Sequence, residues 1–146
     1  GDGEWVERIL AAEGGDLDWH RCDNESQLRA NIATWIAAHE SMFARLMQTD
    51  IEPADALRVL REAQILCALR DGPFGAEGVN ALVTRQLARQ FGFDAGEVWH
   101  HGRPVIVTRN DYARGLFNGD VGIALDRGDG LRVWFDACDA NGSRSF

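Results

Sequence analysis

Arginine and asparagine side chains concentrate in one stretch of this sequence, with aromatic residues among them. The polar residues are Arg103, Arg109, Asn110, Arg114 and Asn118, and the aromatic ones are Tyr112 and Phe117. Arginine and asparagine bind phosphate oxygens, and aromatic rings stack on nucleic-acid bases. The five polar residues are therefore candidate DNA-binding residues, although residues 102–146 hold six arginines and six acids and so make no basic patch.

A nucleotide-binding phosphate loop is excluded. All fifteen basic residues counted as Lys or Arg are arginine, and the Gly-x-x-x-x-Gly-Lys-Ser/Thr loop needs a lysine to reach the terminal phosphates. Gly72, Gly75 and Gly78 recur at a spacing that matches no phosphate fingerprint and indicates a turn. A helix that begins near residue 76 could still bind one anion through its free N–H groups. We expect no cofactor in this segment.

The sequence predicts neither a metal site nor a nucleophilic centre. His100 and His101 are adjacent, so their side chains diverge, and the pair His20 and Cys22 has no second pair nearby. No Gly-x-Ser-x-Gly or His-Glu-x-x-His pattern occurs. Three widely separated cysteines favour a reducing, cytoplasmic compartment, and Cys67 is expected to be a small core residue.

The 146 residues suffice for one compact domain or two small ones, with a net charge of −8. Most of this charge belongs to residues 1–62, which hold thirteen acids and six arginines, as expected of a solvated acidic face. No apolar run approaches the 18 residues or so of a membrane span, and the first ten residues do not resemble a signal peptide. We expect no membrane partner.

The first half of the chain has helical periodicity. Helices are predicted over residues 4–12, 25–48 and 53–62. Asn24 suits the N-cap of the second helix, with Gln27 returning a hydrogen bond, and Pro53 suits the first turn of the third.

The pattern changes at residue 64. The apolar run in QILCALR (64–70) predicts a strand buried on both faces, and residues 76–90 return to helical period. Strands are then predicted over 104–108, 121–125 and 131–135, with Asn118-Gly119 as the positive-φ turn that leads into the second. Such short strands suggest a small bent barrel that needs about two more strands to close. Residues 140–146 could supply one of them.

Two segments resemble the RecD-type alpha subunit of exodeoxyribonuclease V. Their sequences are LREAQILCALRDGPFGAEGVN and GRPVIVTRNDYARGLFNGDVGIALDRGDGLRVWF. The resemblance runs from about Leu60 to Phe135, and NDYARGLFNGDVGIALDRG is its most specific part. The family consists of superfamily-1 helicases that use ATP and Mg²⁺ to move 5′ to 3′ along DNA. They contain two RecA-like motor domains, and the second carries an inserted SH3-like barrel.

The resemblance implies an α+β fold in three parts. Residues 1–62 would be a helical segment, 63–101 a strand–helix piece of the second RecA-like domain, and 102–146 the SH3-like barrel insertion. The family's ATPase motifs are absent from the stretch, so the chain resembles an inactive fragment without catalytic residues. Its implied partners are DNA and the other subunits of the exodeoxyribonuclease V complex.

Two interpretations follow. The fragment guides DNA or contacts neighbouring subunits within an ATP-driven motor, or it is an independent, non-catalytic SH3-like module that binds a partner protein. A lysine-bearing phosphate loop encoded upstream would favour the motor, whereas stop codons on either side would favour the independent module.

Overall fold

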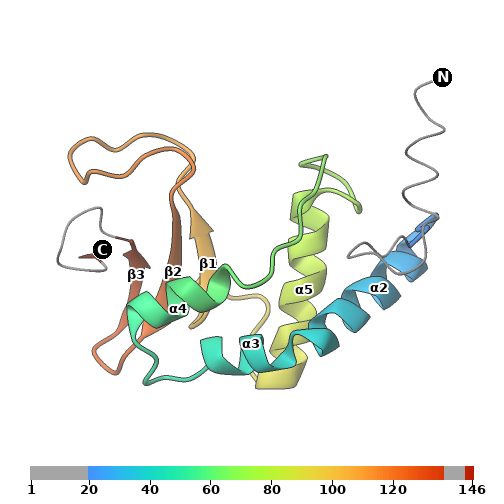
Figure 1. Cartoon of the computed structure of the whole chain (residues 1–146), viewed down its shortest axis with the longest axis horizontal. Coiled ribbons are helices and arrows are strands. Elements are labelled where there is room, and N and C mark those ends of the chain that lie inside the picture. Colours follow the sequence, from blue (N-terminus) through green and yellow to red (C-terminus); the bar gives the residue numbers. More distant parts are fainter. Residues whose placement is uncertain (1–19, 137–143) are drawn as a thin grey trace.

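The computed structural model describes residues 20–136 and 144–146 (Figure 1). The fold is α+β, with the helices preceding one antiparallel sheet in the chain. The helices are α2 (Glu25–Ala38), α3 (Glu40–Leu46), α4 (Pro53–Leu60) and α5 (Ala76–Phe91). The strands are β1 (Arg103–Ile106), β2 (Val121–Asp126), β3 (Leu131–Phe135) and β4 (Arg144–Ser145). The helix predicted over residues 4–12 lies outside the described residues.

Helix α2 begins where its capping residues place it. Asn24 has an extended backbone, and its Oδ1 accepts a hydrogen bond of 3.0 Å from the Gln27 N–H. The Gln27 Oε1 accepts in return from the Asp23 N–H at 2.7 Å, one residue before the cap itself. Two N–H groups at the helix entrance are thereby satisfied, as the sequence predicts.

The single helix predicted over residues 25–48 is wrong, because the chain leaves helical geometry at His39. This residue has φ −112° and ψ 23°, and it separates α2 from α3. Its Nδ1 lies 2.8 Å from the Trp35 carbonyl oxygen, and its ring lies 4.8 Å from the Trp35 indole. The break lets α3 turn toward α4 while its apolar residues stay buried. Periodicity alone does not reveal such a break, since the apolar spacing continues across it.

The strand predicted within residues 64–70 is also not formed in the described part of the chain. Ile65 and Cys67 are half-buried against the core, whereas Leu66 between them is 90% exposed. The side chains thus alternate as in a strand, but no described segment pairs with this backbone. A strand needs a ladder partner as well as the apolar pattern.

The strands form an open sheet in the order β1-β2-β3-β4. Neighbours are antiparallel, with Arg103 opposite Ala124 and Ile123 opposite Trp134. The three strands predicted between residues 104 and 135 are confirmed, and β4 falls in the final segment. The predicted barrel does not close among the described residues, because β1 and β4 remain at opposite edges.

One core joins the helices to the sheet. Figure 1 shows the sheet at one end of the molecule, α2 and α5 at the other, and α4 lying across the sheet. Leu57 of α4 is 2% exposed and belongs to the same apolar cluster as Ile36 of α2 and Ile123 of β2. Within the described residues, no helix is long and apolar enough to cross a membrane.

Candidate nucleic-acid interface

The loop between β1 and β2 holds most of the predicted DNA-binding residues. Backbone hydrogen bonds close its base, since the Val107 N–H donates to Asp120 O at 2.9 Å and the Gly119 N–H donates to Val107 O at 2.8 Å. Gly119 has φ +97°, a conformation that other residues adopt only under strain. The Asn118-Gly119 turn predicted before β2 is therefore confirmed, with the positive φ at the glycine alone.

Asn110 holds this loop together from within. Its Oδ1 accepts from the Asn118 N–H at 2.8 Å, and its Nδ2 donates to the Tyr112 hydroxyl at 3.1 Å. The amide side chain thus joins two parts of the loop that are eight residues apart. Asn110 is consequently a positioning residue, because both ends of its amide are already engaged.

Arg114 is paired inside the loop with Asp111. Its Nη1 lies 2.6 Å from Asp111 Oδ2, and its backbone N–H donates to Asp111 Oδ1 at 3.1 Å. Hydrogen bonds from the Arg114 side chain and backbone hold the pKa of the Asp111 carboxyl below its usual value. The guanidinium remains 61% exposed, so its other N–H groups are accessible to a ligand.

The outer surface of the loop combines cationic, polar and aromatic groups. Arg109 and Asn118 are exposed, Tyr112 is 78% exposed and Phe117 is 49% exposed. The two aromatic rings meet edge to face with centroids 6.2 Å apart. A base could stack on either ring while Arg109 or Arg114 contacts a phosphate. Tyr112 and Phe117 thus join the site as its potential base contacts.

Arg103 does not lie with the other predicted residues. It begins β1, is half-buried, and lines a cavity between the sheet and α5. Arg103 and Arg109 are six positions apart, with the rest of β1 between them. The structure therefore brings together four of the five predicted residues and places Arg103 elsewhere.

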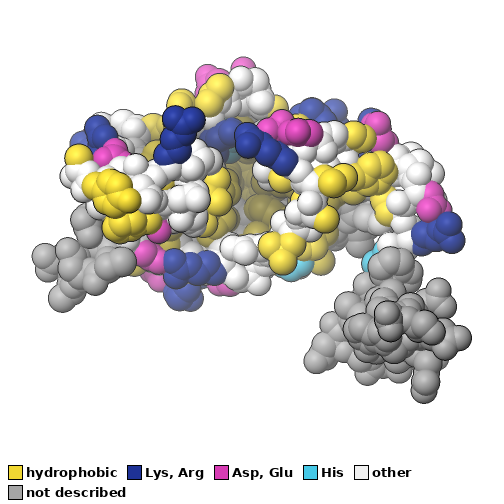
Figure 2. All heavy atoms as spheres, turned by 90° about the horizontal axis from the view of Figure 1, so that it is seen from above, with side chains coloured by type: hydrophobic (Ala, Val, Ile, Leu, Met, Phe, Trp, Pro, Cys, Tyr) yellow, Lys and Arg dark blue, Asp and Glu magenta, His cyan; other side chains and the backbone are white. Residues whose placement is uncertain are grey.

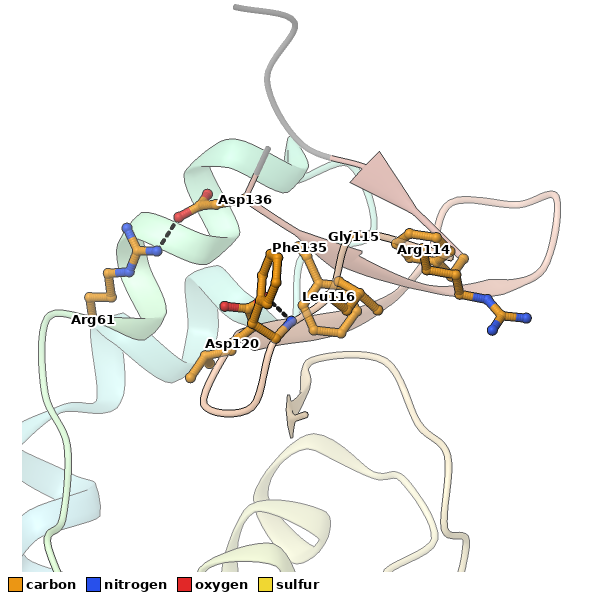
Figure 3. A pocket seen from close by; sticks show the side chains of 10 residues that line it. Arg61, Arg114, Gly115, Leu116, Asp120, Phe135 and Asp136 are labelled. Carbon is orange, nitrogen blue, oxygen red and sulfur yellow. Dashed lines mark hydrogen bonds and ion pairs between the residues drawn. The ribbon is translucent and has the colours of Figure 1, made fainter. Parts of the chain in front are cut away.

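A small cavity lies beneath the loop (Figure 3). Its volume is about 130 Å³, and Leu116, Phe135 and an ion pair between Arg61 and Asp136 line it. In Figure 3 the Arg114 side chain points away from this cavity, toward solvent. Pockets that bind nucleotide-sized ligands measure roughly 300–1,000 Å³, so the cavity is too small for one. Arg61 and Asp136 are 75 residues apart in sequence, so no sequence spacing could have revealed their pairing.

A larger hollow lies between α5 and the edge of the sheet at β1. Two adjoining cavities of about 330 and 260 Å³ share the lining residues Phe43, Leu60, Asn80, Val83, Pro104 and Val121. We call this region the apolar groove. Figure 2 shows hydrophobic side chains lining a hollow on this face, with arginine side chains beside it. Ile65 and Cys67 of the unpaired extended segment line the same groove.

The adjacent histidines each have a structural partner, although the buried Nε2 of His101 has none among the described residues. The His100 ring stacks on Phe93 with centroids 4.3 Å apart, and the His101 Nδ1 accepts from the Asp126 N–H at 3.0 Å. No three His, Cys, Asp or Glu side chains of the described residues gather to hold a metal ion. Cys67 is half-buried against the core, whereas Cys138 lies outside the described residues.

The predicted anion site at the start of α5 is not supported. The N–H groups of Ala76 and Glu77 already donate to the carbonyl oxygens of Leu69 and Arg70, at 2.9 and 3.0 Å. An added Cβ on Gly75 would lie 2.3 Å from Asp71 O, so the preceding turn folds tightly against the helix entrance. The glycines therefore serve this close packing, as the turn interpretation predicts.

The chain is similar in sequence to known proteins over most of its length. No family model matches the chain. The RecBCD enzyme subunit RecD of Mycolicibacterium smegmatis is 37% identical over 135 residues, which cover 91% of this chain and 23% of that subunit. The RecD subunit of Mycobacterium tuberculosis H37Rv is 44% identical over 78 residues, or 53% of this chain and 14% of that subunit. The Haemophilus influenzae subunit is 34% identical over 88 residues, or 58% and 13%. The chain spans less than a quarter of the length of these curated relatives.

Proposed function

Because this chain is homologous to RecD subunits over most of its length, we propose that it is a segment of an ATP-dependent DNA helicase subunit. The parent protein would bind ATP and Mg²⁺, move 5′ to 3′ along DNA, and act in the cytoplasm within a helicase–nuclease complex that processes double-strand ends for repair. The observation that supports this proposal is the 37% identity across 91% of the chain.

The segment would contribute to the motor without hydrolysing ATP itself. Residues 1–62 would form a helical part, 63–101 a piece of the second RecA-like domain, and 102–146 an SH3-like barrel insertion. The alternating burial of residues 63–67 and their lack of a described partner strand support a strand that the rest of the subunit completes. The open edges of the four-stranded sheet similarly leave room for further barrel strands.

The role of the β1–β2 loop would be to guide DNA beside the motor. Arg109, Arg114 and Asn118 would contact phosphates, while Asn110 fixes the loop that presents them. The hydrogen bonds at the loop base and the exposed Tyr112–Phe117 pair support this role. Arg103 would contribute from the groove rather than from the loop.

Contacts with other parts of the complex would use the apolar surface. Leu66 is 90% exposed and Leu69 is 63% exposed on the segment whose Ile65 and Cys67 line the apolar groove. Single exposed apolar residues are common, but a groove lined mostly by apolar side chains favours a binding surface. This surface would contact the remainder of the subunit or a neighbouring subunit.

The DNA role is tested by Arg109→Glu in the longer subunit that contains this chain. Because the change removes one phosphate contact and places a negative charge there, we expect weaker binding to a labelled single-stranded oligonucleotide. The slope of log K against log salt should fall by roughly 0.7 for the lost contact. Fluorescence anisotropy at several salt concentrations measures both effects.

Arg58→Glu is the matched control, since Arg58 is an exposed arginine on α4 and the change in charge is the same. Binding and salt dependence that stay as in the parent after Arg109→Glu would show that the loop is only structural, whereas equal losses in both variants would reveal only an effect of net charge. ATP hydrolysis by the 146-residue chain alone would contradict the fragment assignment.

A further inference from the structure

A second cationic site lies between α2 and α5, apart from the β1–β2 loop. A cavity of about 550 Å³ is lined by Arg29, Ile32, Leu82, Arg85, Gln86 and Arg89. We call it the arginine cleft. Within the described ranges 20–136 and 144–146, the charged residues that line it are all arginines, although the chain as a whole has a net charge of −8.

The helix geometry places these arginines together. Arg85 and Arg89 are four residues apart on α5 and therefore share one face, about 6 Å apart along the helix axis. Arg29 reaches the cleft from α2, which packs against α5 through buried residues such as Ile32 and Leu87. Like charges at this helical spacing repel, so this arrangement destabilises the helix unless an anion compensates it.

The acidic residues of α2 and α5 do not pair with Arg85 or Arg89, so these two arginines can bind an anion. Glu25 is the acidic residue of α2 and Glu77 that of α5, and Glu77 pairs with Arg70 at 3.2 Å. Glu25 lies 3.0 Å from Arg29, but both side chains are more than half exposed. Such an exposed pair is weak and exchanges readily for a phosphate. No ion pair or hydrogen bond engages the Arg85 and Arg89 side chains among the described residues.

We propose that the arginine cleft binds the phosphate backbone of a single-stranded nucleic acid, at a site separate from the β1–β2 loop. Guanidinium groups bind phosphate oxygens in a bidentate manner, and three of them on two helices suit a ligand that carries several phosphates. None of the lining residues in the described part of the chain is aromatic, so the proposed contact is to phosphates and is independent of base sequence. The inference does not depend on the role proposed for the loop.

The test compares two double variants of the 146-residue chain. Arg85→Gln with Arg89→Gln removes two cleft charges, and Arg58→Gln with Arg132→Gln removes two exposed arginines that lie on α4 and β3. Fluorescence anisotropy with a labelled fifteen-nucleotide oligo(dT) gives affinity from low to moderate salt. Because two phosphate contacts disappear, the salt slope of the cleft variant should fall by roughly 1.4. The control variant should show less than half of this change, and circular dichroism verifies that both remain folded.

Each remaining outcome is decisive. Equal losses in the two variants would reveal only an effect of net charge and would overturn the proposal, as would the absence of oligonucleotide binding by the parent chain. If poly-glutamate competes as effectively as unlabelled oligo(dT) at equal charge concentration, the cleft would instead be assigned to an acidic protein. A third double variant, Arg109→Gln with Arg114→Gln, separates the two sites. If its salt slope is unchanged while the slope of the cleft variant is reduced, only the role of the loop would be contradicted.

Discussion

At the scale of single residues, the β1–β2 loop depends on short-range polar contacts rather than on burial. Asp111 accepts from both the side chain and the backbone of Arg114, and Asn110 links Asn118 to Tyr112. These contacts connect residues within eight positions of one another. The amino-acid types therefore indicate which polar groups the loop carries. Which of these groups hold the loop together, and which remain exposed, depends on its three-dimensional contacts.

The Asp111–Arg114 pair predicts a measurable titration. Because Arg114 holds the pKa of the Asp111 carboxyl below its usual value, Arg114→Gln should raise that pKa toward the value of a free aspartate. Arg109→Gln is the control, since Arg109 is exposed and bonds to no Asp111 atom in the described structure. Carboxyl carbon shifts followed by NMR between about pH 2 and 6 measure both variants.

The sign of the pH effect follows from the direction of the shift. A carboxyl with a lowered folded pKa stabilises the loop above its unfolded pKa, and the contribution disappears as the pH falls through the folded value. Arg114→Gln should therefore weaken the loop at neutral pH and leave it unchanged in strong acid. An Asp111 pKa that moves equally in both variants would contradict the assigned pairing.

At the scale of elements, the sequence predicts which segments are helices or strands better than it predicts where they break and what they pair with. The cap at Asn24, the start of α4 at Pro53 and the strands β1 to β3 follow from local residue chemistry, which the structure confirms. The break at His39 and the unpaired segment at 64–70 do not, because each depends on what packs or pairs nearby. The arginine cleft is likewise not predictable from the sequence, since Arg29 and Arg85 line one cavity only when α2 and α5 pack together.

The turn before α5 gives a prediction in which two effects oppose each other. Gly78 lies in the first turn of α5, where alanine would favour the helix by about 1 kcal/mol. An added Cβ, however, would lie 2.4 Å from Gly72 O and 2.8 Å from Pro73 O, and both are backbone atoms. Overpacking costs about 1–3 kcal/mol, and contacts this short to backbone atoms place the cost in the upper half of that range. After the helix gain of about 1 kcal/mol is subtracted, Gly78→Ala should lower the free energy of unfolding by roughly 1–2 kcal/mol.

Gly96→Ala is the matched control for this turn. Its added Cβ would lie 3.2 Å from Asp94 Oδ1, which accepts a hydrogen bond from the Gly96 N–H at 2.8 Å but belongs to an exposed side chain rather than to the backbone. Urea denaturation of the two variants should give a clear loss for residue 78 and a change within about 0.5 kcal/mol for residue 96. If Gly78→Ala proved as stable as the parent, the turn would have to be more open than the structure shows.

At the scale of the whole molecule, the helices and the sheet share one apolar cluster. Leu57 and Val59 of α4 are 2% and 0% exposed, and Ile123 and Leu125 of β2 are 0% and 1% exposed within that cluster. A bidentate ion pair between Arg127 and Glu52 also joins the β2–β3 turn to the entrance of α4, at 2.6 and 3.2 Å. The helices and the sheet therefore contribute side chains to one apolar core in this structure.

This shared core predicts that the helices and the sheet unfold together. Leu57→Ala removes a buried side chain from α4 and should cost about 2–5 kcal/mol, through lost burial and the cavity that remains. If the core is one cooperative unit, slowly exchanging amides of α2, α5 and β2 should lose protection by the same free energy. Hydrogen exchange followed by mass spectrometry measures each segment, and Leu131→Ala is the control because Leu131 is 37% exposed on β3. Loss of protection confined to the helices would show instead that the sheet folds as a separate domain, which is the behaviour expected of an inserted barrel joined to its host only through flexible connections.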